Sequence, residues 1–274
     1  MSPTVVHVAP HPDDEALGCP GALLHLLDRG WSVVSVIASL GFPDQWERRR
    51  AECEEASRRA NFLPVFLEPP LGISLHDDLA AAADRVASEL PGIVSSSGAS
   101  VIVSPSPHDV HHGHEAVARG VQRAVRSLPS TVRWWMWGIW GDLPAPNIFY
   151  PFGEPALVRM LHILDAYEGE LERNDYRRLL SGRASLNAVL GSERVFGFGS
   201  AAASSLPYAE VLTEVRRVGR HWMASHAHHL DEGPLLDEQF TVDLTAWLES
   251  PSVHQLVGPI REVHPGVHDE DGAP

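Results

Sequence analysis

The stretch Thr4-Val5-Val6-His7-Val8-Ala9-Pro10-His11-Pro12-Asp13-Asp14-Glu15 lies near the N-terminus and decides the fold. Its first five residues are a short, mostly β-branched run, which predicts a buried strand that delivers the following residues to the carboxyl edge of a sheet. Leucines at helical spacing within residues 16–29 then predict a helix whose first part is irregular, because it contains Gly18 and Pro20. The segment is therefore interpreted as strand, polar loop and helix.

The same unit recurs along the next hundred residues. Strands are predicted at residues 32–37, 64–67 and 101–103, and the helices that follow them at residues 45–60, 77–90 and 115–126. Alternation of this kind predicts an α/β fold with a Rossmann-like, doubly wound, mostly parallel sheet and helices on both faces. No G-x-G-x-x-G pattern follows the first strand, so the sequence carries no dinucleotide-binding fingerprint.

The pattern changes after about residue 130. We expect one α/β domain over residues 1–274, with a core that holds the metal site in residues 1–130. Residues 131–263 are predicted to form an aromatic-rich, substrate-binding insertion and C-terminal elements, with helices at 154–168 and 208–217, and residues 264–274 a flexible tail. The tryptophan-rich run at 134–144 fits either core packing or a surface for the apolar face of a sugar, an aglycone or an acyl chain.

Composition excludes several classes of partner. The chain has 21 basic and 36 acidic residues, a formal charge of −15, so it would repel a nucleic-acid backbone. No apolar run approaches the roughly 20 residues that span a bilayer, and the N-terminus lacks the features of a signal peptide. We therefore expect a cytoplasmic protein without nucleic-acid or membrane partners. Cys19 and Cys53 are expected to be small packing residues.

Two separate segments offer the ligands of a catalytic zinc ion, which takes three nitrogen or oxygen ligands from the protein and keeps a place for water. His11 and Asp14 are three residues apart in a proline-rigidified loop and can approach one metal ion. His114 follows the fourth predicted strand and can complete the set, because the carboxyl ends of parallel strands share one edge of a sheet. Asp13 can then face the water, whose pKa zinc lowers to about 7, and act as general base.

These segments resemble the PIG-L/LmbE-type zinc N-deacetylases. That family carries an Ala-His-Pro-Asp-Asp-Glu signature after its first strand, and residues 9–15 differ from it by one extra residue before the histidine. Its second signature resembles Asp-x-His-Pro-Asp-His, which here reads Asp109-Val110-His111-His112-Gly113-His114. The family's Asp in the second signature can orient the neighbouring histidine, and here Gly113 stands in its place, so Asp109 is expected to substitute. Weaker resemblance continues at residues 49–52 and 207–211.

The resemblance implies the roles of the individual residues. One Zn²⁺ per chain would be held by His11, Asp14 and His114, with Asp13 as base and His111 as the imidazolium that stabilises the oxyanion and protonates the leaving amine. The substrate contacts that we expect are Arg49, Asp109, Trp140 and Asp142.

Some residues keep two interpretations at this point. Glu15 fits a first-turn helix residue or a support for a ligand. His108 and His112 compete with the two histidines chosen from the same segment. A second group is predicted to be a surface feature and comprises His221, His226, His228 and His229.

The sequence therefore predicts a zinc-dependent hydrolase that removes an N-acyl group, such as acetyl, from a small molecule or natural product containing an amino sugar. An antibiotic-pathway substrate such as a glycopeptide pseudoaglycone is our preferred example. The alternative is a metal-dependent nucleotide-sugar-binding or glycosyltransferase-type module, and a third option is hydrolysis of a different amide, such as a thiol conjugate.

Overall fold

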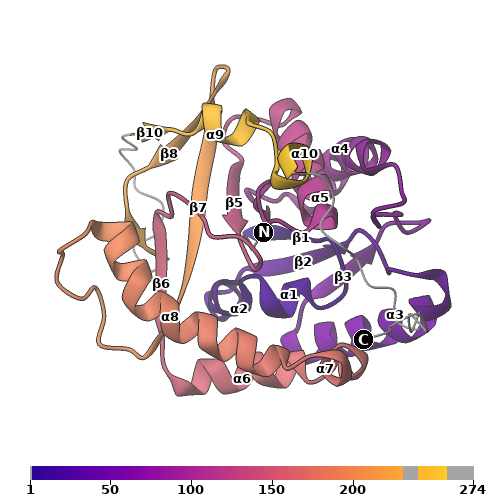
Figure 1. Ribbon diagram of the computed structural model, residues 1–274, viewed down its shortest axis with the longest axis horizontal. Helices are drawn as coiled ribbons and strands as arrows, with labels where there is room; N and C mark the ends of the chain where they lie inside the picture. The colour runs from indigo at the N-terminus through magenta and orange to yellow at the C-terminus, as the bar shows by residue number, and fades with distance from the viewer. Residues whose placement is uncertain (1, 231–239, 258–274) are drawn as a thin grey trace, which may run out of the picture.

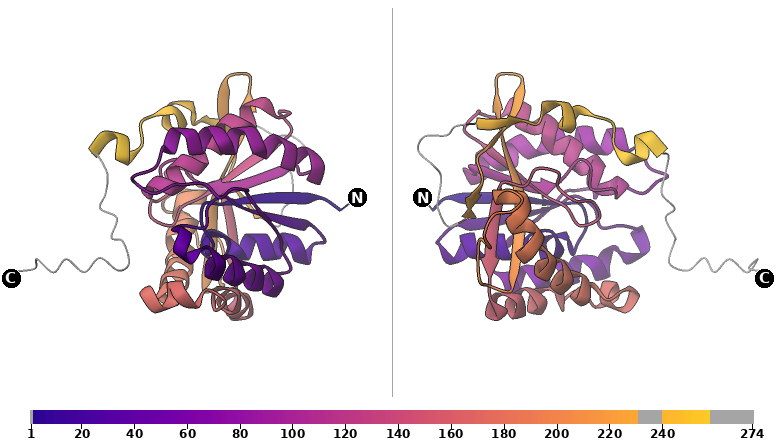
Figure 2. Two further views of the ribbon diagram at one scale, coloured as in Figure 1. Left: turned by 90° about the vertical axis from the view of Figure 1, so that its right-hand side faces the viewer. Right: turned by 60° about the vertical axis from the view of Figure 1, so that its left-hand side comes forward.

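The computed structural model describes residues 2–230 and 240–257. Helices cover both faces of a central sheet, which gives the three layers seen in Figures 1 and 2. Five parallel strands form the sheet's centre in the order β3-β2-β1-β4-β5. Their bounds are β1 Thr4–Ala9, β2 Ser32–Ile37, β3 Leu63–Phe66, β4 Val101–Pro105 and β5 Arg133–Trp137. The predicted α/β, mostly parallel architecture is confirmed.

The strand order reverses between β1 and β4. Val5 of β1 pairs with Val33 of β2 on one side and with Val101 of β4 on the other. Loops that leave the carboxyl ends of two such strands diverge to opposite faces and open a crevice, where ligands of this fold class bind. The segments that follow β1 and β4 are the two that carry the predicted site.

Two apolar cores lie on the two faces of the sheet. One packs the sheet against the helices α1 Asp14–Leu17, α2 Pro20–Asp28, α3 Trp46–Ala60, α6 Glu154–Leu164 and α8 Tyr176–Phe196. The other packs it against α4 Leu79–Ser97, α5 His112–Ser127 and α9 Thr245–Glu249. Parallel strands covered on both faces bury nearly all their side chains, which explains the continuous apolar runs of β1 and β4.

The tryptophan-rich run belongs mostly to the core. Trp134, Trp135 and Trp137 lie in β5 and are buried, whereas Trp140 follows the strand and is 44% exposed. Core packing is therefore the correct interpretation for three of the four rings. Because β5 is a strand of the central sheet, the core extends past residue 130, where we had expected an insertion to begin.

The helix predicted at residues 208–217 is wrong. Residues Tyr208–Val218 form the long strand β7, which pairs antiparallel with β5, with β6 (Ile148–Phe152) and with β8 (His221–Ser225). β-branched side chains recur there with a period of two, at Val211, Thr213 and Val215. That period and the β-branched composition favour a strand, and pairing with three neighbouring strands holds it in the sheet.

The remaining elements are short helices and two short strands. They are the 3₁₀ helix η1 Pro43–Gln45, α7 Glu168–Arg173, β9 His228–His229, β10 Phe240–Asp243 and α10 Val253–Val257. His228 is buried, so the predicted surface location of the second histidine group is wrong for this member. Cys19 and Cys53 are buried free thiols, as expected. Residues 264–274 lie outside the described ranges. Among the described helices, none combines the length and apolarity needed to cross a bilayer.

Glu210 ties β7 to the helix that follows the first loop. Its carboxylate accepts hydrogen bonds from the backbone amides of Gly21 and Ala22 at the start of α2, at 2.8 and 2.7 Å. The side chain is buried, and burial raises its pKa to about 7 even though both amides favour the charged form. A strand near the C-terminal end thereby fixes the helix that supports the first loop.

We expect Gly120 to be required by close packing of α5 against α4. A Cβ at Gly120 would lie 2.6 Å from both the carbonyl oxygen of Ala83 and Cβ of Val86. Gly120→Ala should therefore lower the free energy of unfolding by about 1–3 kcal/mol, despite the better helix propensity of alanine. Gly182 is the matched control, because a Cβ there meets nothing within 4 Å in the helix α8, and Gly182→Ala should raise stability by about 0.5–1 kcal/mol. Urea unfolding of both variants measures this, and equal effects would contradict the packing explanation.

Glu210 should make stability depend on pH. Its folded pKa of about 7 lies above the ordinary value of 4.5, so the unfolded chain loses its proton first as pH rises. Stability from this group is therefore full below about pH 4.5 and falls by about 3 kcal/mol up to about pH 7. Glu210→Gln should flatten that part of the curve of unfolding free energy against pH, whereas exposed Glu54→Gln should not. An unchanged slope in Glu210→Gln would refute the assignment.

Candidate active site

The loop after β1 is closed by its own carboxylate. Asp14, the first residue of α1, accepts a hydrogen bond from the backbone amide of His11 at 2.8 Å. Asp13 adopts a left-handed backbone conformation with φ of 108°, which is strained for a residue with a Cβ. The two neighbouring carboxylates consequently have different surroundings, as the predicted division between ligand and base requires.

Three histidines from the two loops meet beside Asp14. Ring nitrogens of His11, His111 and His114 lie within 4.8 Å of one another, a group that could hold a metal ion. Asp14 Oδ2 lies 3.3 Å from His11 Nδ1, and Asp14 Oδ1 lies 3.2 Å from His114 Nε2. The structure thus brings together the three predicted ligands, with His111 as a fourth neighbour.

The charges of this group suit a cation. Burial alone would raise the pKa of Asp14, but the adjacent His114 and His11 hold it well below its usual range. The site therefore contains a buried carboxylate in its charged form and two imidazoles, a donor set that zinc commonly takes in hydrolases. The residues present fit the predicted metal.

Asp109 lies behind His114 and does not reach the cleft. The side chain is fully buried, and its Oδ2 lies 2.8 Å from His114 Nδ1. Its Oδ1 accepts hydrogen bonds from the backbone amides of Ile139, Trp140 and Gly141 at 2.8 to 2.9 Å. The Asp109 carboxylate therefore holds His114 rather than the ring of His111, and the substrate contact of Asp109 stays a prediction. Its bond to His114 instead directs that ring's other nitrogen towards Asp14.

His111 is the N-cap residue of α5, and its environment favours the neutral ring. Nδ1 accepts a hydrogen bond from the backbone amide of Gly113 at 3.2 Å, so the proton of the neutral ring sits on Nε2. Burial, followed by the neighbouring His114 and His11, lowers the pKa of His111 far below its usual value. A metal cation would lower it further. This ring is therefore suited to donate one hydrogen bond, and the imidazolium that we expected is disfavoured.

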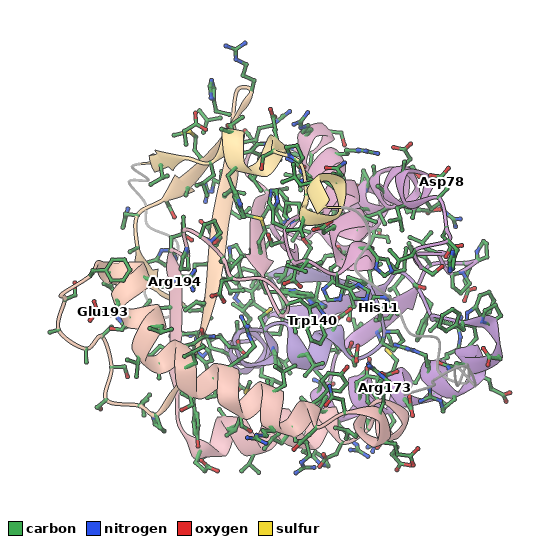
Figure 3. All side chains as sticks on the ribbon, viewed as in Figure 1. His11, Asp78, Trp140, Arg173, Glu193 and Arg194 are labelled. Atoms are coloured by element: carbon green, nitrogen blue, oxygen red, sulfur yellow. The ribbon has the colours of Figure 1, made fainter. Side chains whose placement is uncertain are left out.

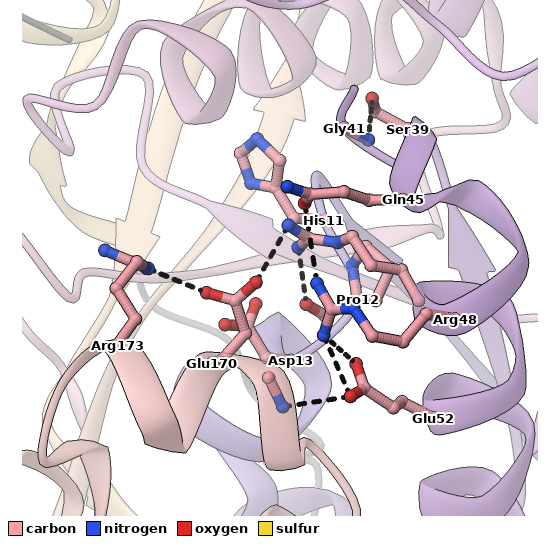
Figure 4. A network of polar contacts seen from close by, with 12 residues as sticks. His11, Pro12, Asp13, Ser39, Gly41, Gln45, Arg48, Glu52, Glu170 and Arg173 are labelled. Atoms are coloured by element: carbon pink, nitrogen blue, oxygen red, sulfur yellow. Dashed lines mark hydrogen bonds and ion pairs between the residues drawn. The ribbon is translucent and has the colours of Figure 1, made fainter. Parts of the chain in front are cut away.

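Arg49 supports the first loop from α3. It donates a hydrogen bond to the carbonyl oxygen of Pro12 at 3.1 Å and forms an ion pair with Glu170 of α7 at 2.9 Å. Glu170 pairs in turn with Arg173 at 2.8 Å (Figure 4). The expected substrate contact of Arg49 stays a prediction, but much of its hydrogen-bonding capacity serves to position the loop.

Asp13 lines the cleft and has an elevated proton affinity. Burial, and then the charge of Asp14, raise its pKa well above the usual value. Glu15 stands behind it, because Glu15 Oε2 accepts the backbone amide of Asp13 at 3.3 Å and Tyr167 donates its hydroxyl to Oε1. Of the two interpretations of Glu15, a buried support of the site agrees with these contacts, and burial raises the pKa of Glu15 to about 8.

A cleft of about 950 Å³ opens in front of these residues. Besides the candidate metal site, side chains that line it include Phe42, Trp46, Arg49, Trp140, Arg173 and Tyr176. Figure 3 shows Trp140 near His11 at the centre of the molecule. Asp142 is not part of this cleft: its carboxylate lies 3.6 Å from Arg183 and from Arg194 and lines a separate, smaller hollow. The substrate contact of Asp142 stays a prediction.

The competing histidines of the second segment, His108 and His112, are not members of the histidine group that could hold a metal ion. His108 Nε2 lies 2.7 Å from the carbonyl oxygen of Trp247, and His112 is buried with its ring stacked on His111. Three residues that line the cleft were not predicted from the sequence: Glu170, Arg173 and Tyr176. They follow a segment with no motif, and only tertiary packing brings them to the site.

Gly113 makes room for a candidate ligand. A Cβ at this position would lie 3.1 Å from His11 Cε1 and 3.0 Å from Ile73 Cδ1. An aspartate at position 113, as in the family signature, would therefore require His11 or Ile73 to move. The glycine at position 113, where the family signature has aspartate, thus allows the candidate ligand His11 to pack closely against α5.

We expect Gly113→Ala to weaken metal binding by displacing the His11 ring. The contacts are tight rather than overlapping, so we expect a loss of affinity of about tenfold, close to 1.4 kcal/mol. Zinc retention during titration with a competing chelator measures it, with Gly182→Ala as the control for an added methyl group in a helix. The double variant Gly113→Ala with Ile73→Val should recover part of the loss, and unchanged retention in Gly113→Ala would contradict the packing argument.

Comparison with known proteins supports the sequence interpretation. Residues 6–125 match the family described as PIG-L: GlcNAc-PI de-N-acetylase. The predicted resemblance to the PIG-L/LmbE-type N-deacetylases is thereby confirmed for this part of the chain. A comparison with curated proteins gave no match.

Several solved structures share the fold. The conserved protein TT1542 from Thermus thermophilus has a TM-score of 0.58 at 22% identity, over 77% of this chain and 94% of that chain. The A40926 pseudoaglycone deacetylase Dbv21 has a TM-score of 0.59 at 15% identity, over 79% and 98% of the two chains. GalB, the 4-carboxy-2-hydroxymuconate hydratase from Pseudomonas putida KT2440, has a TM-score of 0.60 at 15% identity, over 80% and 98%.

Proposed function

We propose that this protein is a zinc-dependent hydrolase that removes an N-acetyl group from a small molecule containing an amino sugar. The match of residues 6–125 to the PIG-L family supports this proposal. One observation carries the proposal: a buried carboxylate and two imidazoles converge from two loops, and a second carboxylate of raised pKa lies next to them in an open cleft.

We propose that one zinc ion is held by His11, Asp14 and His114. Zinc would supply Lewis-acid activation of a water molecule and of the acyl carbonyl. Asp109 contributes by keeping His114 in one tautomer and one orientation, with Nδ1 directed to its own carboxylate and Nε2 towards the metal position. His11 is held at the same time by the turn that Asp14 closes.

Asp13 is proposed to act as general base and then as general acid. Its carboxylate takes a proton from the attacking water, and its raised pKa lets it keep that proton until the amine departs. His111 donates its Nε2 hydrogen to the developing oxyanion, because Nδ1 is already the acceptor of the Gly113 amide. A neutral ring has no second proton to give, so the leaving amine receives its proton from Asp13.

The substrate that we favour is a glycosylated natural product, such as a glycopeptide pseudoaglycone. The size of the cleft and its aromatic side chains support a substrate larger than one sugar ring. A solved structure of the same fold is named as a pseudoaglycone deacetylase. The nucleotide-sugar-binding alternative requires a bound nucleotide without hydrolysis, and nucleotide binding measured by calorimetry discriminates it from deacetylation.

The Asp13→Asn variant tests the division of labour. Asparagine preserves the shape of Asp13 but cannot accept the proton, so we expect acetate release from N-acetylglucosamine conjugates to fall by about 10²–10⁴-fold. Zinc content, measured by atomic emission, should remain at the wild-type level because Asp13 is not a proposed ligand. Loss of zinc in this variant would show that Asp13 is a ligand instead.

The ligands are tested by a separate pair of variants. His11→Ala combined with Asp14→Ala should remove both the metal and the activity. Asp77→Asn is the matched control at the rim of the same cleft, since Asp77 lines it without contacting the candidate ligands. Undiminished acetate release by the double variant would refute the proposed function.

A further inference from the structure

We propose that Trp140 is a fixed aromatic platform that determines specificity by stacking on an apolar ring in the part of the substrate remote from the acetamide. This inference rests on the proposed function and adds to it the recognition of a second ring. The sequence alone left the tryptophan-rich run open between packing and binding. In the structure, Trp140 differs from the three buried tryptophans because its side chain is exposed. It differs also in the groups that hold its backbone.

The backbone of the Trp140 turn is held from two directions. On one side, Asp109 Oδ1 accepts the amides of Ile139, Trp140 and Gly141. On the other, the guanidinium of Arg183 in α8 donates to the carbonyl oxygens of Gly138 and Ile139, at 2.9 and 3.0 Å. A planar guanidinium with two parallel donors fixes two acceptors at once, which a lysine cannot do.

The turn is also too compact to shift easily. A Cβ at Gly138 would lie 2.1 Å from the carbonyl oxygen of Gly141, and a Cβ at Gly141 would lie 2.7 Å from the carbonyl oxygen of His108. Both positions therefore require glycine, and the chain passes against itself and against the second metal-site loop. The position of Trp140 is thus linked directly to the loop that carries two of the candidate site histidines.

The ring of Trp140 rests on Tyr176. Their centroids are 6.4 Å apart at an interplanar angle of 72°, an edge-to-face contact. Tyr176 is buried and is itself held, because the guanidinium carbon of Arg173 lies 5.3 Å from its ring centroid and the same side chain donates to its hydroxyl. Arg173 pairs with Glu170, as described above.

Trp140 also lines the cleft of the candidate site. The residue is 44% exposed and lines the same cleft as His11, Asp13 and His114. A volume of about 950 Å³ is at the upper end of pockets that bind drug-sized ligands, so it accommodates more than one sugar ring. A residue whose backbone is already held in place loses less freedom when a ligand stacks on its ring, which favours a binding role over simple packing.

The ligand chemistry that fits is a ring with an apolar face. Both an aryl aglycone and the C–H face of a second pyranose have this property, and the platform itself does not distinguish them. The structure therefore assigns a ring with an apolar face as the ligand. A comparison of substrates distinguishes an aryl aglycone from a second pyranose.

Three acetamido substrates test the platform: methyl N-acetylglucosaminide, its p-nitrophenyl counterpart and N,N′-diacetylchitobiose. We expect wild-type kcat/KM to be at least about tenfold higher for a substrate with a second ring than for the methyl glycoside. In Trp140→Ala this preference should fall to near one, mainly through KM. Trp140→Phe should retain part of it. Whether the p-nitrophenyl glycoside or the disaccharide shows the larger preference identifies the source of the ring.

Arg183 is tested as a positioning residue. Arg183→Met should reduce the ring preference about as much as Trp140→Ala, and Arg183→Lys should restore only part of it, since lysine replaces one of two hydrogen bonds. Phe198→Ala is the matched control, because Phe198 is an exposed aromatic ring outside the cleft. Thermal unfolding of each variant separates loss of the fold from loss of the platform.

The outcomes distinguish this inference from the proposed function. If wild type releases acetate but shows no ring preference, or if Trp140→Ala and Trp140→Phe both keep the full preference, the platform is refuted and the deacetylase proposal stands. If wild type releases no acetate from any of the three, the proposed function fails. Calorimetric binding of the p-nitrophenyl glycoside then decides the platform, with weaker binding by Trp140→Ala supporting it and equal binding refuting it.

Discussion

The Asp14 carboxylate, held between the rings of His11 and His114, is the interaction on which the site depends. A charged carboxylate is costly to bury, and it is stable here because two imidazoles and a backbone amide surround it. That arrangement is available only if the loop after β1 meets the loop after β4. The parallel order β2-β1-β4 provides the meeting point, since the two loops leave adjacent strands at the point where the order reverses.

Around this interaction, several parts of the site are held by neighbouring side chains. Asp109 orients His114, Glu15 holds the amide of Asp13, and Arg49 holds the carbonyl of Pro12. Support of this kind fixes side chains on loops with the accuracy that is otherwise found on rigid elements. Asp109 has a second partner, the Trp140 turn, so the metal site and the wall of the cleft share one buried carboxylate.

The sequence was sufficient to predict the parts of the fold that depend on local pattern. The β-branched runs of β1, β2 and β4 indicated buried parallel strands, and the loop positions of His11 and His114 followed from the topology of such sheets. β7 was misassigned although its β-branched side chains alternate, because its pairing partners β5 and β6 lie far away in the chain. Asp109, Glu170 and Asp142 show the same limit, because the partner of a charged side chain is decided by tertiary packing.

The neighbouring folds restrict how much the architecture itself can explain. Similar structures are named as a pseudoaglycone deacetylase and as a hydratase, so this scaffold supports more than one chemistry. The type of reaction must then be determined by the side chains around the candidate metal position. Here the amide of Gly113 occupies Nδ1 of His111 and leaves a single N–H donor, while burial and the charge of Asp14 raise the pKa of Asp13. Amide hydrolysis requires both a stabilised oxyanion and a proton for the departing amine. In the proposed mechanism, His111 as the fixed donor and Asp13 as the carboxyl group that carries the proton would meet both requirements without the aspartate that the family signature places at position 113.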